Sequence, residues 1–351
     1  MFGRSKSLVG LDIGSSAVKA IELKPAGKGY KVAAFATEPI PPDSIVDGAI
    51  IDGAAVVDAI RRAFESRGIK TKDVAASLSG NAVIVKKISL PSMTDAELDE
   101  SIQWEAEQYI PFDIQDVNLD YQILNRADIG GKSTMEVLLV AAKKEKIADY
   151  TGVIGQAGRV AVVIDVDAFA LQNAYEANYG VEAGSVVVLL NVGASATNIN
   201  ILHGDQSVFT RDLSTGGNAY TEALQKELNL PFELADQLKR GHPVDGVSFD
   251  DAKPVLRAVT ENLVLEVQKT FDFFRASAAN DRISRIVVSG GASRAEGFVE
   301  MLSERFQAPV ETFDPFRKVA FDAARFKLDA AEIAPTAAVA VGLALRRAGD
   351  R

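Results

Sequence analysis

Two short turns rich in glycine and serine are the parts of this 351-residue sequence best suited to bind an anion. They are Gly14-Ser15-Ser16 and Gly193-Ala194-Ser195, and each joins two apolar segments typical of strands. Successive backbone N–H groups in such a turn form a nest for an anion, and serine hydroxyls add further donors. Either turn alone is more often a plain hairpin connection, because short motifs also occur by chance.

The segments that contain the two turns are similar to each other. Residues 8–23 read LVGLDIGSSAVKAIEL and residues 187–202 read VVLLNVGASATNINIL, which places Asp12 over Asn191 and Gly14 over Gly193. This internal repeat predicts two similar lobes that face each other across a cleft. A polyphosphate bound by both turns would lie in that cleft and would hold the lobes together.

Other residues near these turns could complete a nucleotide site. Asp12 ends a predicted strand, so its carboxylate could hold the water shell of Mg²⁺, or it could simply cap the turn. Gly216-Gly217 and Gly290-Gly291 lack side chains, so a base or a ribose could approach their backbone closely. Taken alone, both glycine pairs are ordinary chain breakers.

The composition excludes several other classes of site. The sequence has no cysteine and two histidines, which rules out disulfides, thiol nucleophiles and metal sites rich in cysteine or histidine. The net charge is −10 and there is no basic tract, which disfavours nucleic-acid binding. No apolar segment is long enough to span a membrane, so we expect a cytoplasmic protein.

The hydrophobic pattern positions these motifs on an α/β framework. It predicts a strand–turn–strand unit around each turn, and a capping box at Thr94 and Glu97 opens a separate helix–strand–strand–helix–strand unit. We expect a first lobe, an α+β subdomain inserted in it, and a second lobe whose last helix returns to the first. The corresponding ranges are 1–90 with 160–184, 91–159, 185–335, and 336–347 for the returning helix.

At this point the sequence resembles the superfamily of actin-like ATPases, which includes heat-shock chaperones and sugar kinases. Residues 9–23 and 187–202 resemble its two phosphate motifs, and residues 286–300 (IVVSGGASRAEGFVE) resemble its adenosine motif. Its two connecting helices resemble residues 167–178 and 335–346, and Ala235–Lys239 resembles a stretch that meets the adenosine. All these motifs occur in the expected order along nearly the whole chain.

Within the superfamily the sequence resembles the PilM family of type IV pilus assembly, which is similar to the cell-division protein FtsA. The residues that carry this resemblance are Ile45-Val46-Asp47-Gly48, the run 105–124, the run 166–174 and Asp314-Pro315-Phe316. It implies two actin-like (ribonuclease H-like) lobes around a nucleotide cleft, with ATP and Mg²⁺ as cofactors. FtsA ends in an amphipathic membrane helix, for which the last residues here, 345–351, are no match.

The pattern and the resemblance together assign a set of site residues. Asp12 would face the metal, directly or through water, and Asp167 matches a position that orients the attacking water. The residues assigned to the nucleotide are Asp12, Gly14, Ser15, Ser16, Lys19, Asn191, Gly193, Ala194, Ser195, Gly216, Gly217, Asp236, Lys239, Gly290, Gly291 and Ala292. Many relatives have an acid where Asn191 stands and a glutamate where Asp236 stands, so we expect at most a slow ATPase.

The resemblance also implies partners. It makes the protein a cytoplasmic component of the inner-membrane pilus platform that binds the N-terminal cytoplasmic peptide of PilN, in a manner linked to the nucleotide. The inserted residues 91–159 would line the peptide site, and other platform proteins and motor ATPases would lie nearby. The membrane would be reached only through partners, and self-association is open. The alternatives are a polymerising filament protein like FtsA and a small-molecule kinase of the same superfamily.

Overall fold

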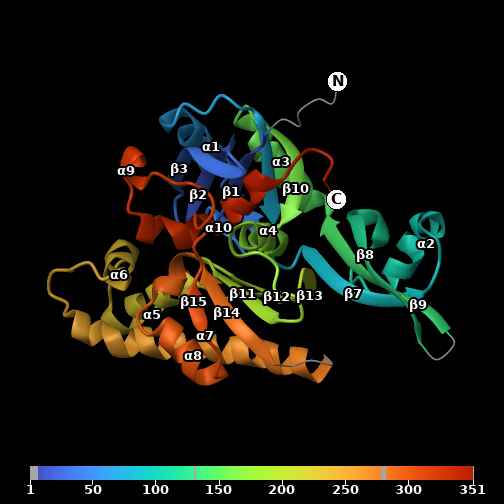
Figure 1. The fold of residues 1–351 in the computed structure, drawn as a ribbon. Helices are drawn as coiled ribbons and strands as arrows, with labels where there is room; N and C mark the ends of the chain where they lie inside the picture. Colours follow the sequence, from blue (N-terminus) through green and yellow to red (C-terminus); the bar gives the residue numbers. More distant parts are fainter. Residues whose placement is uncertain (1–6, 130–131, 278–281, 351) are drawn as a thin grey trace.

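Two five-stranded sheets with the same strand order form the framework of the molecule (Figure 1). The structure is a computed structural model that describes residues 7–129, 132–277 and 282–350. The first sheet has the order β10-β6-β1-β2-β3. Read from the equivalent edge, the second has the order β15-β14-β11-β12-β13. The strands of the first are β1 Val9–Ile13, β2 Ala17–Ala26, β3 Gly29–Pro39, β6 Asp73–Leu78 and β10 Val160–Val166; those of the second are β11 Val186–Val192, β12 Thr197–His203, β13 Gln206–Leu213, β14 Ile283–Ser289 and β15 Val310–Thr312.

The pairing of the strands is also the same in both sheets. β1 pairs antiparallel with β2 and parallel with β6, and β11 pairs antiparallel with β12 and parallel with β14. The third strand, β3 or β13, extends each antiparallel set, and the fifth, β10 or β15, extends each parallel set. The internal repeat seen in sequence around the two turns therefore extends to the whole of each sheet.

The two sheets and the helices on their faces form five layers, with helices between the sheets and on each outer face. Helices α4 (Asp167–Tyr179) and α10 (Ala330–Leu345) lie between the two sheets and form one core with both of them (Figure 1). Helices α1 (Gly53–Ser66) and α3 (Lys144–Gln156) cover the outer face of the first sheet. On the second sheet, α7 (Phe249–Ser277) and α8 (Phe298–Phe306) cover the outer face. Helices α5 (Gly217–Leu228) and α6 (Phe232–Lys239) pack beside α7.

A separate three-stranded sheet projects from the first lobe. It has the order β7-β9-β8, from β7 (Val83–Pro91), β8 (Val117–Ile129) and β9 (Lys132–Lys143), and α2 (Asp95–Glu107) covers one face. The capping box of Thr94 and Glu97 is confirmed. The bounds differ from the expected 91–159, because β7 pairs with β9 in this sheet whereas α3 packs in the core of the first lobe.

The helix that returns to the first lobe is longer than its sequence suggests. We expected it over 336–347, but α10 begins at Ala330, and the Asp329 side chain accepts a hydrogen bond from the Ala331 N–H as its cap. Pro335 is the sixth residue of this helix, so it lies past the first turn and removes the N–H that would otherwise bond to the Ala331 carbonyl. The smaller elements are β4 Ile45–Val46, β5 Ala49–Ile50, α9 Ala323–Phe326 and the 3₁₀ turns η1 Ile114–Asp116 and η2 Gly291–Arg294.

Helix α10 is held in backbone contact with its neighbours through two glycines. A Cβ atom on Gly342 would lie 1.7 Å from the carbonyl oxygen of Ala170 in α4. On the other side, a Cβ on Gly10 of β1 would lie 2.0 Å from the carbonyl oxygen of Ala340. Because these neighbours are backbone atoms, they cannot rotate away, and any side chain at either position must push the helix out.

We predict that Gly342→Ala lowers the free energy of unfolding by about 1–3 kcal/mol, the usual range for overpacking a core. Gly152→Ala is the matched control, because Gly152 is also inside a helix but has open space where a Cβ would stand. It should raise stability by about 0.5–1 kcal/mol. Urea unfolding of both variants is the measurement, and equal effects would contradict the close contact between α10 and α4.

Candidate functional site

The two repeated turns have the same internal hydrogen bond. The Gly14 N–H donates to the Ala17 carbonyl at 3.2 Å, and the Gly193 N–H donates to the Ala196 carbonyl at 2.9 Å. The N–H of each glycine is therefore engaged within its own turn and is not available to an anion. The following N–H groups, of Ser15, Ser16, Ala194 and Ser195, donate to no acceptor within the described residues. Each turn therefore offers two adjacent donors, as an anion nest requires.

The glycine-rich segments of the second lobe gather around its turn. The Gly217 N–H donates to the Gly193 carbonyl at 2.8 Å, and a Cβ on Gly216 would lie 2.6 Å from the same oxygen. A Cβ on Gly290 would lie 2.2 Å from the Val192 carbonyl oxygen. Gly217 also faces the Ala292 methyl group, 3.2 Å from where its own Cβ would stand. The structure thus brings together the segments 191–195, 216–217 and 290–292 that the sequence singled out.

The charged pair on α6 lies beside these glycines. The Lys239 ammonium is 2.6 Å from the Asp236 carboxylate and donates to the Thr221 hydroxyl at 2.7 Å and, more weakly, to the Gly217 carbonyl at 3.4 Å. Asp236 also pairs with Arg240 at 2.6 Å. These contacts fix α6 against the start of α5, so Lys239 lies next to Gly217.

Asp12 and Lys19 form an ion pair beside the first turn. They are directly opposite each other on β1 and β2, and the Lys19 ammonium is 2.9 Å from the Asp12 carboxylate. Both side chains are largely buried, with 16% and 15% of their surface exposed. The Lys19 ammonium is 3.8 Å from where a Cβ on Gly14 would stand. The first turn therefore has a cation at its side and a carboxylate next to that cation.

The repeat aligns this ion pair with an uncharged pair in the second lobe. Asn191 and Asn198 occupy the equivalent positions, opposite each other on β11 and β12, and the Asn191 amide donates to the Asn198 side-chain oxygen at 3.0 Å. Sequence reasoning noted Asn191 but missed Asn198, although the alignment that pairs Asp12 with Asn191 also pairs Lys19 with Asn198.

A carboxylate that the sequence did not reveal, that of Asp212, extends the pair of Asn191 and Asn198. Asn198 donates to Asp212 of β13 at 2.8 Å, and the other carboxylate oxygen of Asp212 accepts the Gly80 N–H at 2.5 Å. Gly80 belongs to the first lobe, between β6 and β7, so Asp212 joins the two lobes. Its place opposite Asn198 depends on the register of β12 and β13, which the sequence does not show.

Asp167 stands at the start of α4, close enough to Asp12 for the two charges to interact. It accepts a hydrogen bond from the Ser77 hydroxyl at 2.5 Å, and the Ser79 hydroxyl also lowers its pKa. Burial, and secondarily the nearby negative charge of Asp12, outweigh these bonds and raise the pKa of Asp167 to about 6. At pH 7 it is mostly ionised, and the positive end of the helix dipole favours that state.

Comparison with known proteins gives the family. The family model described as type IV pilus assembly protein PilM matches residues 10–348. The chain belongs to this family. In a solved PilM–PilN type IV pilus biogenesis complex, one chain is 31% identical, with a TM-score of 0.86 over 98% of this chain and 99% of that one.

More distant proteins share the fold. MreB5 of Spiroplasma citri bound to AMPPNP has a TM-score of 0.54 at 15% identity, over 97% of this chain and 95% of that one. The cell division protein FtsA of Enterococcus hirae is 24% identical over 350 residues, which is 88% of this chain and 78% of that protein. The predicted actin-like α/β fold and the resemblance to the PilM family are both confirmed.

Among the described residues, no group of three or more histidine, aspartate or glutamate side chains is arranged to hold a metal ion. Mg²⁺ usually takes one or two carboxylates and completes its shell with water and substrate phosphates. A single carboxylate such as Asp12 beside a phosphate nest fits that pattern. Within the same residues, no helix combines the length and hydropathy needed to cross a bilayer.

We predict that Asp167→Asn raises stability at pH 7 by about 1–3 kcal/mol. The folded-state pKa of about 6 lies above the model value of 3.8, so burial of the charged form costs free energy above pH 6. As the pH falls from 7 towards 4, the folded protein takes up a proton and the wild type should gain stability, whereas the variant should not. Thermal unfolding between pH 4 and 8 tests this.

Asp149→Asn is the control for that series, because Asp149 is exposed on α3 and should leave the pH dependence as in the wild type. Identical profiles for the wild type and Asp167→Asn would show that Asp167 carries no burial penalty.

Proposed function

We propose that this protein binds Mg-ATP between its two lobes and acts as a nucleotide-dependent docking component of the type IV pilus platform. The observation that supports nucleotide binding is the pair of equivalent turns, each with two adjacent free N–H donors. Those donors and Lys19 would hold the phosphates, and Asp12 would hold water molecules of the metal. Bound Mg²⁺ neutralises phosphate charge. The base and ribose would lie against Gly216, Gly217 and Gly290, beside the Asp236–Lys239 pair.

Hydrolysis is a minor activity in this proposal. The ion pair of the first lobe is matched in the second by two neutral amides, Asn191 and Asn198, so the second lobe holds the metal more weakly. Asp167, held by the Ser77 hydroxyl, is the residue placed to orient a water molecule. The protein would then spend most of its time with ATP bound, as suits a docking component.

We predict that Lys19→Met weakens ATP binding at least tenfold, since one charge-assisted hydrogen bond contributes more than the roughly 1.4 kcal/mol required. Lys24→Met is the matched control: it lies on the same strand, its side chain is 60% exposed, and its loss should leave affinity unchanged. Titration calorimetry with Mg-ATP is the measurement. Unchanged affinity in a folded Lys19→Met variant would remove the first turn from the proposed site.

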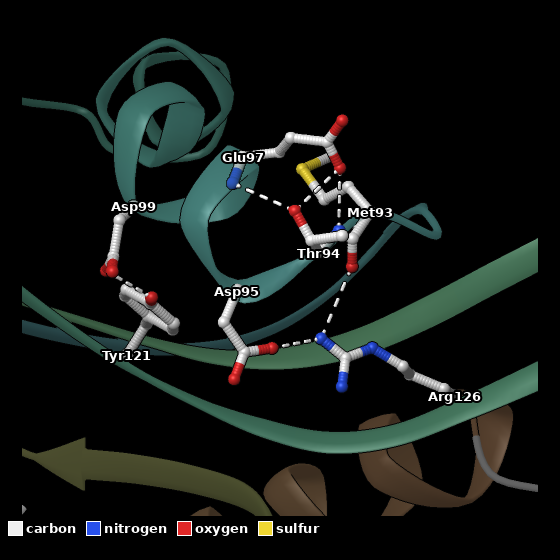
Figure 2. A network of polar contacts seen from close by, with 7 residues as sticks. All are labelled: Met93, Thr94, Asp95, Glu97, Asp99, Tyr121 and Arg126. Carbon is white, nitrogen blue, oxygen red and sulfur yellow. Dashed lines mark hydrogen bonds and ion pairs between the residues drawn. The ribbon is translucent and has the colours of Figure 1, made fainter.

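The partner site belongs to the inserted sheet, and α2 leaves one of its faces for docking. On the other face, alternate residues of β9 pack under α2, which polar contacts fix in place. Figure 2 shows these contacts: Arg126 pairs with Asp95 at 2.5 Å and Tyr121 donates to Asp99 at 2.5 Å. A hollow of 520 Å³ lies beside them, and its lining residues are Ser92, Met93, Thr94, Asp95, Glu97 and Arg126.

The opposite face carries an apolar strip that begins at the first lobe. Val83 and Ala142, paired across β7 and β9, pack against the core of the first lobe. Val85 and Val140, both half-buried, form the next pair in the direction away from the lobe, and Leu138 beyond them is already buried. An extended segment with aliphatic side chains at alternate positions would fit such a strip, with backbone pairing adding affinity. The occupant we propose is the N-terminal cytoplasmic segment of PilN.

The whole-chain similarity to the PilM chain of a PilM–PilN complex supports this partner. Binding to PilN would bring the protein to the inner membrane, with other platform proteins and the motor ATPases as neighbours. Gly80 provides the link to the nucleotide. It comes three residues before β7, and its N–H is held by Asp212 of the second lobe. A change in the spacing of the lobes would pull on the strand that carries Val83 and Val85.

We predict that Val85→Asp weakens binding of a labelled PilN N-terminal peptide at least tenfold, because a buried carboxylate at the strip would lack a partner. Val160→Asp is the matched control, an exposed valine on the edge strand β10. Fluorescence anisotropy gives both affinities, and repeating the titration with saturating ATP tests the link to the nucleotide. If both variants bind like the wild type, the peptide site lies elsewhere.

A further inference from the structure

A lysine that no part of the proposed site uses is buried where the two lobes meet. Lys146, in the first turn of α3, is 8% exposed, and within the described residues its ammonium has no hydrogen-bond or ion-pair partner. Burial lowers its pKa, although the carboxylates of Asp167, Asp149 and Asp212 oppose the shift. The ammonium is not among the fully buried side-chain atoms of the described residues that lack a partner, so it remains open to an anion that approaches from outside.

The Ile45-Val46-Asp47-Gly48 motif holds this lysine in place. Gly48 lies in the turn between β4 and β5 with a φ of 74°, and a Cβ there would stand 2.4 Å from the Lys146 ammonium. The Tyr150 hydroxyl donates to the Gly48 carbonyl at 3.1 Å, and the Lys146 ammonium lies 5.5 Å from the centre of the Tyr150 ring. The glycine thus leaves room for the ammonium, and the tyrosine fixes the turn against it.

The surroundings of Lys146 come from both lobes. Asp167 begins α4 in the first lobe, and Asp212 reaches across from β13 to the Gly80 N–H. The turn that holds the lysine touches the same place, since the Asp47 carbonyl oxygen is 3.7 Å from where a Cβ on Gly80 would stand. Asp167 in turn lies near Asp12. Lys146 and Asp12 therefore both lie close enough to Asp167 for their charges to act on it.

We propose that Lys146 binds the terminal phosphate of the nucleotide and so makes the protein prefer ATP to ADP. This inference rests on the proposed binding of ATP between the lobes. The inner phosphates have the N–H donors of the turns and Lys19, whereas Lys146 faces Asp167, the residue placed to orient water at the terminal phosphate. An added phosphate would supply the anion that Lys146 lacks, and the ammonium would offset the repulsion between that phosphate and the nearby aspartates.

Lys146→Met tests the proposal by the ratio of two affinities. Calorimetric titrations with Mg-ATP and Mg-ADP should show ATP weakened at least tenfold and ADP less than threefold. Lys144→Met is the matched control, an exposed lysine on the same helix whose ammonium donates to the Gln115 carbonyl, and it should change neither affinity. An equal loss for ATP and ADP, or no loss for either, would overturn the proposal.

Two additional variants guard against a misfolded protein. Lys146→Gln keeps a polar side chain without the charge, and Gly48→Ala keeps the lysine but displaces its ammonium; both should reduce the preference for ATP while thermal unfolding remains cooperative. A variant that gains thermal stability but keeps the wild-type preference would show that Lys146 only balances the aspartates, and the proposal would be wrong. A wild type that binds neither nucleotide would instead contradict the proposed function.

Discussion

The two lobes share one buried layer, and that layer depends on backbone contact between two helices. α4 and α10 lie between the sheets, and Gly342 brings α10 against the Ala170 carbonyl without room for a side chain. The same two helices carry residues of the site: Asp167 begins α4, and the Pro335 carbonyl of α10 accepts the Gly290 N–H at 2.7 Å. The positions of the site residues in both lobes are thus set by how closely these helices pack.

The internal repeat is close in backbone and unequal in charge, and under the proposed function that inequality would favour nucleotide binding over hydrolysis. Both turns have the same hydrogen bond, but the positions that form an ion pair at Asp12 and Lys19 hold two amides at Asn191 and Asn198. The carboxylate of the second lobe is instead Asp212, one strand farther out, and it accepts a bond from the first lobe. Part of its hydrogen-bonding capacity is therefore engaged in joining the lobes before any metal arrives.

Local patterns predicted what is local in this protein. The glycine turns, the capping box at Thr94 and the strand–turn–strand units depend on neighbours within a few residues, and the structure has them. The order of the motifs also predicted the fold, because the same order is found in a known superfamily. The expected start of the returning helix at residue 336 was wrong, because α10 begins at Ala330 behind the Asp329 cap. Asp212, Lys146 and the pairing of β7 with β9 depend on contacts between residues far apart in the chain, which one sequence cannot reveal.

The route from nucleotide to partner follows from where the chain leaves the first lobe. β6 belongs to the sheet of the first lobe and β7 to the inserted sheet, and Gly80 lies between them. Asp212 holds that connection from the second lobe, and the turn that positions Lys146 touches it from the first. A phosphate that attracts Lys146 would act on both, and β7 begins only three residues later. The path between the two proposed sites is therefore a short stretch of backbone, which a change in the spacing of the lobes would move while each lobe keeps its own fold.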